Sequence, residues 1–240
     1  MECTAARLRA AVIREIEGQR GSQETHRHRI PLGLLMMEQG WISPDQLRRA
    51  LAAQRSAGTG RLGQWLVEQR AATEESVTRA LGLQWSCPVL SPESHENATL
   101  AAAMPLLFVD AFAALPLRLA AGKVLYLGFE EGLDPVLALA VERINGLRVE
   151  CGMVRESLFG PAHARLLEAR FPSAELVEAV SPLAAANALA RSVERSRPVA
   201  SRLVRVHDCL WLRSWLQVQR GPLPDIGAVE DVICTIGAVA

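Results

Sequence analysis

The chain has 240 residues, of which 50% are hydrophobic and 22% are charged. This composition is typical of an ordinary soluble globular protein, and the length predicts one or two domains with enough volume for a core. The 26 Lys and Arg residues balance the 26 Asp and Glu residues, so no overall field steers the chain toward nucleic acid or an anionic membrane. No stretch approaches the ~20 continuous apolar residues of a membrane-spanning helix. We therefore expect no nucleic-acid partner and no direct membrane insertion.

The chain contains a single lysine, and its surroundings exclude one large class of enzyme. A P-loop NTPase needs a glycine, four residues and then Gly-Lys-Ser/Thr to cradle phosphate and hold Mg²⁺. Lys123 lies in Gly122-Lys123-Val124, where Leu117 takes the place of the first glycine and Val124 that of the hydroxyl residue. The sequence therefore excludes a Walker-type NTPase.

The cysteines are scattered along the chain and form no Cys-x-x-Cys pair: they are Cys3, Cys87, Cys151, Cys209 and Cys234. Such an odd set is typical of reduced, mostly buried thiols and not of a disulfide framework or a zinc site. The start of the chain also lacks the apolar core of a signal peptide. We expect a cytoplasmic protein without a metal.

The first 29 residues divide into a helix and a connector. Apolar residues recur at helical spacing over residues 4–18, which predicts an amphipathic helix that docks on another part of the protein. The polar run that follows is interpreted as a connector, and its basic end, His26–Arg29, as a solvated segment.

The most informative feature is an internal repeat with an offset of 30 residues. Leu32–Gln54 aligns with Leu62–Gln84 with eight identities in 23 positions, their order preserved. The identical pairs are Leu32/Leu62, Gly33/Gly63, Glu38/Glu68, Gln39/Gln69, Arg49/Arg79, Ala50/Ala80, Leu51/Leu81 and Gln54/Gln84. Each copy is predicted to form a short helix, a turn and a second helix, which gives two helix pairs.

Capping signals mark the helix boundaries within each copy. Ser43-Pro44-Asp45-Gln46 predicts a capping box with proline in the first turn, and Thr73-Glu74-Glu75 takes the same role in the second copy. Gly40 follows the first short helix, where a left-handed residue is preferred. Arg70 stands at the equivalent position, and we expect it to cost ~1 kcal/mol in that conformation.

After the repeat, the pattern changes to a small α/β module over residues 91–155. Two strands joined at Ala121-Gly122, a helix that begins after Asp134 and a third strand over residues 147–154 are predicted. This β-β-α-β order leads us to expect a small antiparallel sheet with helices on one face.

The last third predicts helices at 156–170 and 181–195, a hairpin turning at His207-Asp208, and a final strand at 229–236. The whole chain is therefore expected to be α+β. Its predicted parts are a helix and connector at 1–29, the tandem helical repeat at 30–90, the small α/β module at 91–155 and an α+β C-terminal extension at 156–240.

Clusters of reactive residues in the second half have structural explanations. His207-Asp208-Cys209 does not form a triad by itself, because catalytic partners must converge in space, so a turn with an ordinary buried cysteine is preferred. Trp211 and Trp215 predict part of the core or a partner-docking surface. Four acidic residues show no pairing that suggests acid–base catalysis: Glu142, Glu150, Glu156 and Glu168.

The tandem motif resembles the N-terminal domain of the type II secretion and type IV pilus assembly ATPases, the MshE-N/GspE-N family, without the ATPase domain. The pieces that carry the resemblance are Pro31-Leu32-Gly33, Gly40-Trp41-Ile42, Leu47, Leu51 and Gln54 in the first copy, and Arg61-Leu62-Gly63, Leu66-Val67, Val77, Leu81 and Gln84 in the second. The resemblance extends over about residues 30–155. In that family the tandem units bind cyclic di-GMP, and the domain docks onto cytoplasmic partners of the secretion or pilus machine.

The resemblance implies cyclic di-GMP as a ligand and no other cofactor. Arg61 would contact the nucleotide, and the Leu-Gly pairs would offer an apolar surface for a base and bare backbone near a phosphate. The residues so implied are Leu32, Gly33, Leu51, Gln54, Arg61, Leu62, Gly63, Leu81 and Gln84. Pro31 replaces the arginine of the first copy, so half of that recognition is missing unless Arg29 reaches the site. Loss of one charge-assisted contact weakens binding about ten- to hundredfold.

Three functions follow from these patterns. The preferred one is a non-catalytic adaptor or regulator that docks on a secretion or pilus component and is tuned by cyclic di-GMP. The alternative is a stand-alone cyclic-dinucleotide sensor unrelated to secretion. The third is an enzyme whose site lies in residues 156–240.

Overall fold

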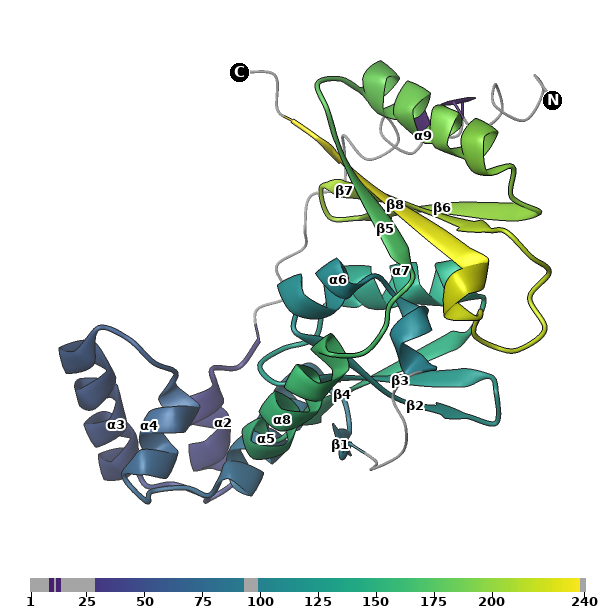
Figure 1. The fold of residues 1–240 in the computed structure, drawn as a ribbon. Coiled ribbons are helices and arrows are strands. Elements are labelled where there is room, and N and C mark those ends of the chain that lie inside the picture. Colours follow the sequence, from purple (N-terminus) through teal and green to yellow (C-terminus); the bar gives the residue numbers. More distant parts are fainter. Residues whose placement is uncertain (1–8, 11, 14–28, 93–98, 238–240) are drawn as a thin grey trace.

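The computed structural model describes residues 9–10, 12–13, 29–92 and 99–237. The chain is α+β, with a helical unit that projects from a body of two mixed β-sheets (Figure 1). Most of the amphipathic helix predicted at 4–18, and the connector up to residue 28, lie outside the described residues. The described part of that helix is helical, and its Val12 is fully buried.

The helical unit contains four helices at the positions that the repeat predicts. They are α2 (Leu32–Glu38), α3 (Pro44–Ala57), α4 (Leu62–Glu68) and α5 (Glu74–Trp85). The four helices pack mainly across the two copies. Helix α3 of the first copy contacts α4 of the second, and α2 of the first contacts α5 of the second. They share one small core, formed by Leu35, Met36, Ile42, Leu47, Ala50, Leu66 and Ala80.

The predicted capping signals of the repeat are confirmed. The Ser43 hydroxyl accepts a hydrogen bond from Gln46 N at 3.2 Å, and the Gln46 side chain accepts one from Ser43 N at 2.7 Å. The Thr73 hydroxyl caps α5 in the same way. Gly40 and Arg70 both adopt left-handed backbone conformations, with φ of 69° and 56°. The arginine therefore occupies a conformation that its Cβ disfavours.

The first sheet has the strand order β1-β4-β3-β2. Its strands are β1 (Val89–Leu90), β2 (Ala114–Ala120), β3 (Val124–Phe129) and β4 (Arg148–Val154). The predicted hairpin is confirmed as β2–β3, with Lys123 in its turn, outside any strand-to-helix loop. The prediction of an antiparallel sheet is wrong, since β4 runs parallel to both β3 and β1. Helix α7 (Pro135–Asn145) connects β3 to β4. Because the chain crosses back along this helix before it enters β4, the two strands run in the same direction.

The second sheet has the order β5-β8-β7-β6. Its strands are β5 (Ser173–Ala179), β6 (Ala200–Val206), β7 (Cys209–Trp215) and β8 (Val229–Ile236). The hairpin at His207-Asp208 and the last strand are confirmed. Strand β5, which pairs in parallel with β8, was not predicted. It is a mostly exposed edge strand and therefore lacks a hydrophobic pattern.

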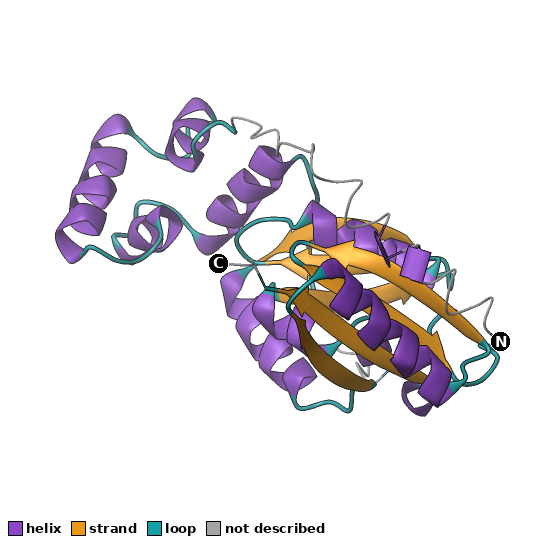
Figure 2. Ribbon diagram, turned by 90° about the horizontal axis from the view of Figure 1, so that it is seen from above, coloured by secondary structure: helices purple, strands orange, loops and turns teal. Residues whose placement is uncertain are grey.

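Helices separate and cover the two sheets (Figures 1 and 2). Helix α7 contacts β4 on one side and β6 on the other, so it lies between the sheets. Helix α9 (Pro182–Ser196) covers the other face of the second sheet. The remaining helices are the 3₁₀ segments η1 (Leu100–Ala103) and η2 (Ile226–Ala228), and α6 (Leu106–Ala111) and α8 (Glu156–Leu167). Within the part of the chain that the structure describes, no helix combines the length and apolarity needed to cross a bilayer.

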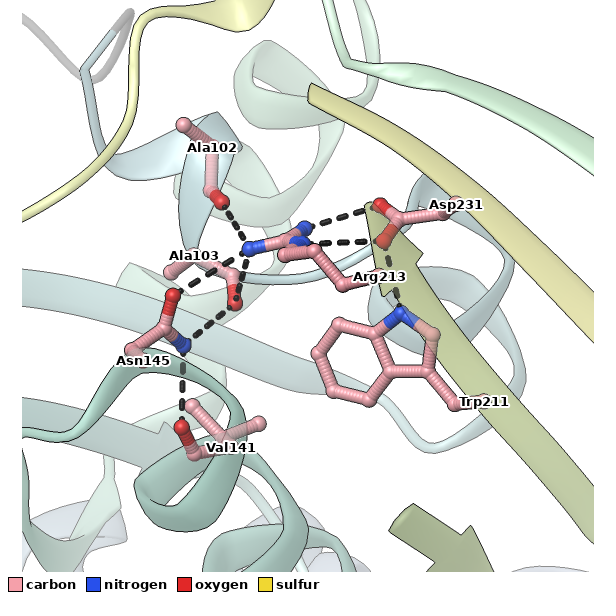
Figure 3. Close-up of polar contacts among 7 residues, drawn as sticks. All are labelled: Ala102, Ala103, Val141, Asn145, Trp211, Arg213 and Asp231. Carbon is pink, nitrogen blue, oxygen red and sulfur yellow. Dashed lines mark hydrogen bonds and ion pairs between the residues drawn. The ribbon is translucent and has the colours of Figure 1, made fainter. Parts of the chain in front are cut away.

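A buried ion pair within the second sheet also forms hydrogen bonds to η1 and α7 beside that sheet (Figure 3). Arg213 on β7 donates from Nε and Nη2 to the two carboxylate oxygens of Asp231 on β8, at 2.8 Å each. Its Nη1 donates to the Ala102 carbonyl of η1 at 2.7 Å and to Oδ1 of Asn145 on α7 at 3.1 Å. Trp211 donates its indole N–H to Asp231 at 2.8 Å. Trp211 and Trp215 are therefore part of the core and not of a docking surface.

Candidate functional site

A pocket of about 530 Å³ lies where the second copy of the helical repeat meets the first α/β sheet and the start of α8. Its size falls within the range of ordinary ligand sites. It is lined by Leu32, Arg61, Leu62, Gly63, Gln64, Val67, Glu68, Glu74, Val77, Thr78, Leu81, Glu130, Glu131, Val154, Glu156 and Ser157. The pocket therefore combines an apolar wall, mainly from α4 and α5, with a polar rim whose carboxylates come from α4, α5, the loop after β3 and the start of α8.

Five of the nine site residues predicted from the resemblance line this pocket: Leu32, Arg61, Leu62, Gly63 and Leu81. The other four, Gly33, Leu51, Gln54 and Gln84, do not line it. The structure therefore brings the second copy of the motif, except Gln84, to one place, together with a single leucine of the first copy.

The two motif glycines permit close helix packing. A Cβ on Gly63 would lie 2.7 Å from Cγ1 of Val77 on α5, and a Cβ on Gly33 would lie 2.5 Å from Cδ1 of Leu47 on α3. Real Cβ atoms do not approach neighbours so closely, so a side chain at either position would require the facing Val77 or Leu47 to move. Packing alone accounts for a glycine at each position.

The two motif glutamines make reciprocal contacts between the copies. Gln54 Nε2 donates to the carbonyl oxygen of Gly60 at 2.8 Å, directly before the second motif. Gln84 Nε2 donates to the carbonyl oxygen of Ile30 at 2.7 Å, directly before the first motif. Each copy thus fixes the entry of the other, and the unit has an approximate two-fold relationship.

Arg61, just before α4, is the central charged residue of the pocket. Its Nη1 lies 2.6 Å from Glu130 Oε1 and 3.0 Å from Glu131 Oε1, and its Nη2 lies 3.8 Å from Glu156 Oε1. Burial works against its charge, but the hydrogen bond with Glu130 and the charges of Glu130, Glu131 and Glu156 outweigh burial and raise the pKa of Arg61. The guanidinium is therefore engaged within the protein.

The rim of the pocket carries more negative than positive charge. Five carboxylates face one guanidinium, so the formal charge of the lining is one minus five, or −4: the acids are Glu68, Glu74, Glu130, Glu131 and Glu156. Glu74 accepts hydrogen bonds from the backbone N–H and the hydroxyl of Ser157, at 2.6 and 2.8 Å. Gln64 donates to Glu156 at 3.1 Å. These bonds connect α4 and α5 to α8.

Sequence reasoning missed the acidic partners of Arg61. The sequence showed no pairing of Glu156 that suggests acid–base catalysis, yet Glu156 lines the pocket and lies 3.8 Å from Arg61. Glu130 and Glu131 follow directly on β3, and two adjacent carboxylates at the carboxyl end of a predicted strand were the available signal.

The first copy offers no equivalent of the Arg61 site. Pro31 stands at the corresponding position and is exposed. Arg29 does not compensate for it, because its guanidinium carbon lies 3.3 Å from the ring centroid of Trp85, in a cation–π contact. Neither residue lines the pocket.

Outside the pocket, His207 has a polar partner, and the thiols of Cys151 and Cys209 have raised pKa values. His207 Nε2 lies 2.6 Å from Asp134 Oδ2, in the turn that the sequence predicts. Burial, with the nearby charge of Asp208, raises the pKa of the half-buried Cys209 thiol. Burial also raises the pKa of Cys151 from 9.0 to about 12, with a further contribution from Cys87. Among the described residues, no group of three or more His, Cys, Asp or Glu side chains is arranged to hold a metal ion.

Comparison with known proteins returns similar structures only. No protein-family model matches the chain, and no curated protein matches it. A solved structure of MshE with cdg is 25% identical over 57% of this chain and 99% of that chain, with a TM-score of 0.45. The N-terminal domain of XpsE is 18% identical in two crystal forms, over 60% of this chain and 97% or 98% of the other, with TM-scores of 0.38 and 0.30. The resemblance predicted from the tandem motif thus recurs in the structure comparison. All three TM-scores lie below 0.5.

Proposed function

We propose that the chain is a non-catalytic adaptor in the cytoplasm that docks on a protein component of a secretion or pilus assembly machine. The tandem motif supports the choice of machinery. The observation that carries the docking role is the pocket itself, because it presents a partly exposed apolar wall beside a charged rim. Sites with this composition bind an apolar group and orient it through a few polar contacts.

The chemistry of the pocket supports a binding role over a catalytic one. The groups that would act as acid or base are carboxylates, and three of them surround Arg61. The hydroxyl of Thr78 donates to the Glu74 carbonyl oxygen at 3.0 Å, and the hydroxyl of Ser157 donates to the Glu74 carboxylate. Among the described residues that line the pocket there is no histidine or lysine, so neither hydroxyl has beside it the imidazole or amine that typically activates a hydroxyl nucleophile.

The adaptor proposal is tested by photocrosslinking with the full chain in the cells that produce it. A photoreactive residue at Val67 reports on the pocket, because Val67 belongs to the apolar wall and is 36% exposed. A matched probe at Val199, beside the second sheet and 59% exposed, reports on an unrelated surface. We expect the first probe, and not the second, to capture a secretion or pilus component. Capture of no such component from position 67 would contradict the proposal.

A second candidate function is a cyclic di-GMP sensor, favoured by the convergence of Arg61, Leu62 and Gly63 on one pocket. A phosphate would have to take the guanidinium from Glu130 and Glu131, whose own charge repels it. Calorimetry tests this function directly. A sensor would bind the dinucleotide, lose binding with Arg61→Ala and bind more tightly with Glu131→Gln. Absence of heat at tens of micromolar ligand would exclude this function.

A further inference from the structure

We infer that the occupant of this pocket is a basic segment of a protein partner, with an arginine or lysine flanked by aliphatic residues. The inference rests on the proposed docking function and names the chemistry of the partner. It follows from the shape of the apolar wall, the charge of the rim and the state of Arg61.

The apolar wall defines one half of the occupant. Five aliphatic side chains line the pocket beside the rim: Leu62 and Val67 of α4, Val77 and Leu81 of α5, and Val154 of β4. All but Val154 retain some exposure to solvent. Aliphatic side chains of a partner would remove this surface from water, which favours binding in proportion to the area covered.

The rim defines the other half, because it is negative even with Arg61 in place. Glu131 and Glu156 remain 65% and 54% exposed, and Glu156 lies 3.8 Å from Arg61, beyond direct hydrogen-bond distance. Glu68 forms no ion pair within the part of the chain that the structure describes. These three carboxylates have oxygen atoms free to accept hydrogen bonds from a cation.

The contacts of Arg61 show which kind of group the carboxylates of the rim bind. Its guanidinium lies within 3.0 Å of two carboxylates from a different part of the chain, at the edge of an apolar wall. An arginine of a partner would meet the same combination of carboxylates and aliphatic surface at Glu68, Glu156 and the remaining oxygen of Glu131. An anionic occupant would meet net repulsion at the same place, so charge complementarity selects a basic segment.

A random 12-residue peptide library displayed on phage tests the inference without assuming a sequence. It is selected on the full chain and then compared on two double variants. Glu68→Gln/Glu131→Gln neutralises two exposed acids of the rim, and Glu178→Gln/Glu194→Gln neutralises two exposed acids on β5 and α9. Neither variant alters a buried side chain, so both are expected to fold.

We expect selection of peptides with Arg or Lys next to aliphatic residues. Loss of two exposed charge contacts should weaken their binding about 2- to 30-fold on the rim variant, with no change on the control variant. Selected peptides without basic residues, or equal binding to both variants, would overturn the inference and leave the docking function intact. Failure to select any peptide would contradict both. Binding of cyclic di-GMP with no peptide selected would favour the sensor instead.

Discussion

Removal of the Arg213 guanidinium should destabilise the fold more than removal of a surface arginine. Arg213 and Asp231 both have fully buried side chains, and Arg213→Met leaves the carboxylate with one remaining contact, the Trp211 indole (Figure 3). It also leaves the Ala102 carbonyl and Asn145 without their donor. Removal of one partner of a buried ion pair costs ~3–5 kcal/mol of unfolding free energy.

The assay is equilibrium urea unfolding followed by tryptophan fluorescence at neutral pH. The matched control is Arg195→Met, since Arg195 pairs with Glu175 at the surface and its side chain is 64% exposed. An exposed pair is worth ~0–1 kcal/mol. We therefore expect the two variants to differ by ~2 kcal/mol or more. A loss of less than ~1 kcal/mol for Arg213→Met would refute the role given to the buried pair.

Three further outcomes follow from the packing, the backbone and the thiols. Gly63→Ala should lower the free energy of unfolding by urea by ~1–3 kcal/mol, because the new Cβ meets Val77. Val77→Ala in the same chain should recover part of this loss. If the effects of the two substitutions simply add in the double variant, the contact is contradicted. Arg70→Gly should stabilise the fold by ~1 kcal/mol, because glycine adopts the left-handed conformation without the strain of a Cβ. Gly40→Ala should destabilise the fold by a similar amount for the same reason. If both substitutions shift the free energy of unfolding in the same direction, backbone conformation is not the cause. The pKa of Cys151 is raised to about 12 in the fold, so its contribution to the free energy of unfolding is present below pH 9 and is lost as the pH rises toward 12. Cys151→Ala should flatten this decline, measured by unfolding at several alkaline pH values.

The helical repeat could be placed from the sequence because its signals are local. Ser43 and Thr73 cap the helices that follow them, and these bonds involve residues three positions apart. Gly40 ends the first helix through its own backbone conformation. Each of these features depends on a few neighbouring residues and survives in any tertiary context.

The errors concern features set by distant parts of the chain. The direction of β4 depends on the path of α7 across the sheet, and strand order alone does not specify it. Strand β5 exists because β8, more than fifty residues later, pairs with it. Its exposed Glu175, Leu176 and Glu178 provide no period-two burial signal.

The candidate site divides in the same way. Arg61, Leu62 and Gly63 belong to a recognisable motif and could be named from the sequence. Their carboxylate partners come from the loop after β3 and from α8, and only the packing of the repeat against the sheet brings them together. The sign of the charge around the arginine, which decides what the pocket accepts, was therefore beyond sequence reasoning.

Gln54 and Gln84 each donate to the backbone carbonyl before the motif of the other copy, and this reciprocity has a consequence for the duplicated unit. A single copy by itself would leave its glutamine amide and the carbonyl group before its motif without these partners, so the two copies complete each other's hydrogen bonding. The same position of the repeat therefore meets carboxylates in one copy and solvent in the other: Arg61 contacts Glu130 after β3, whereas Pro31 is exposed.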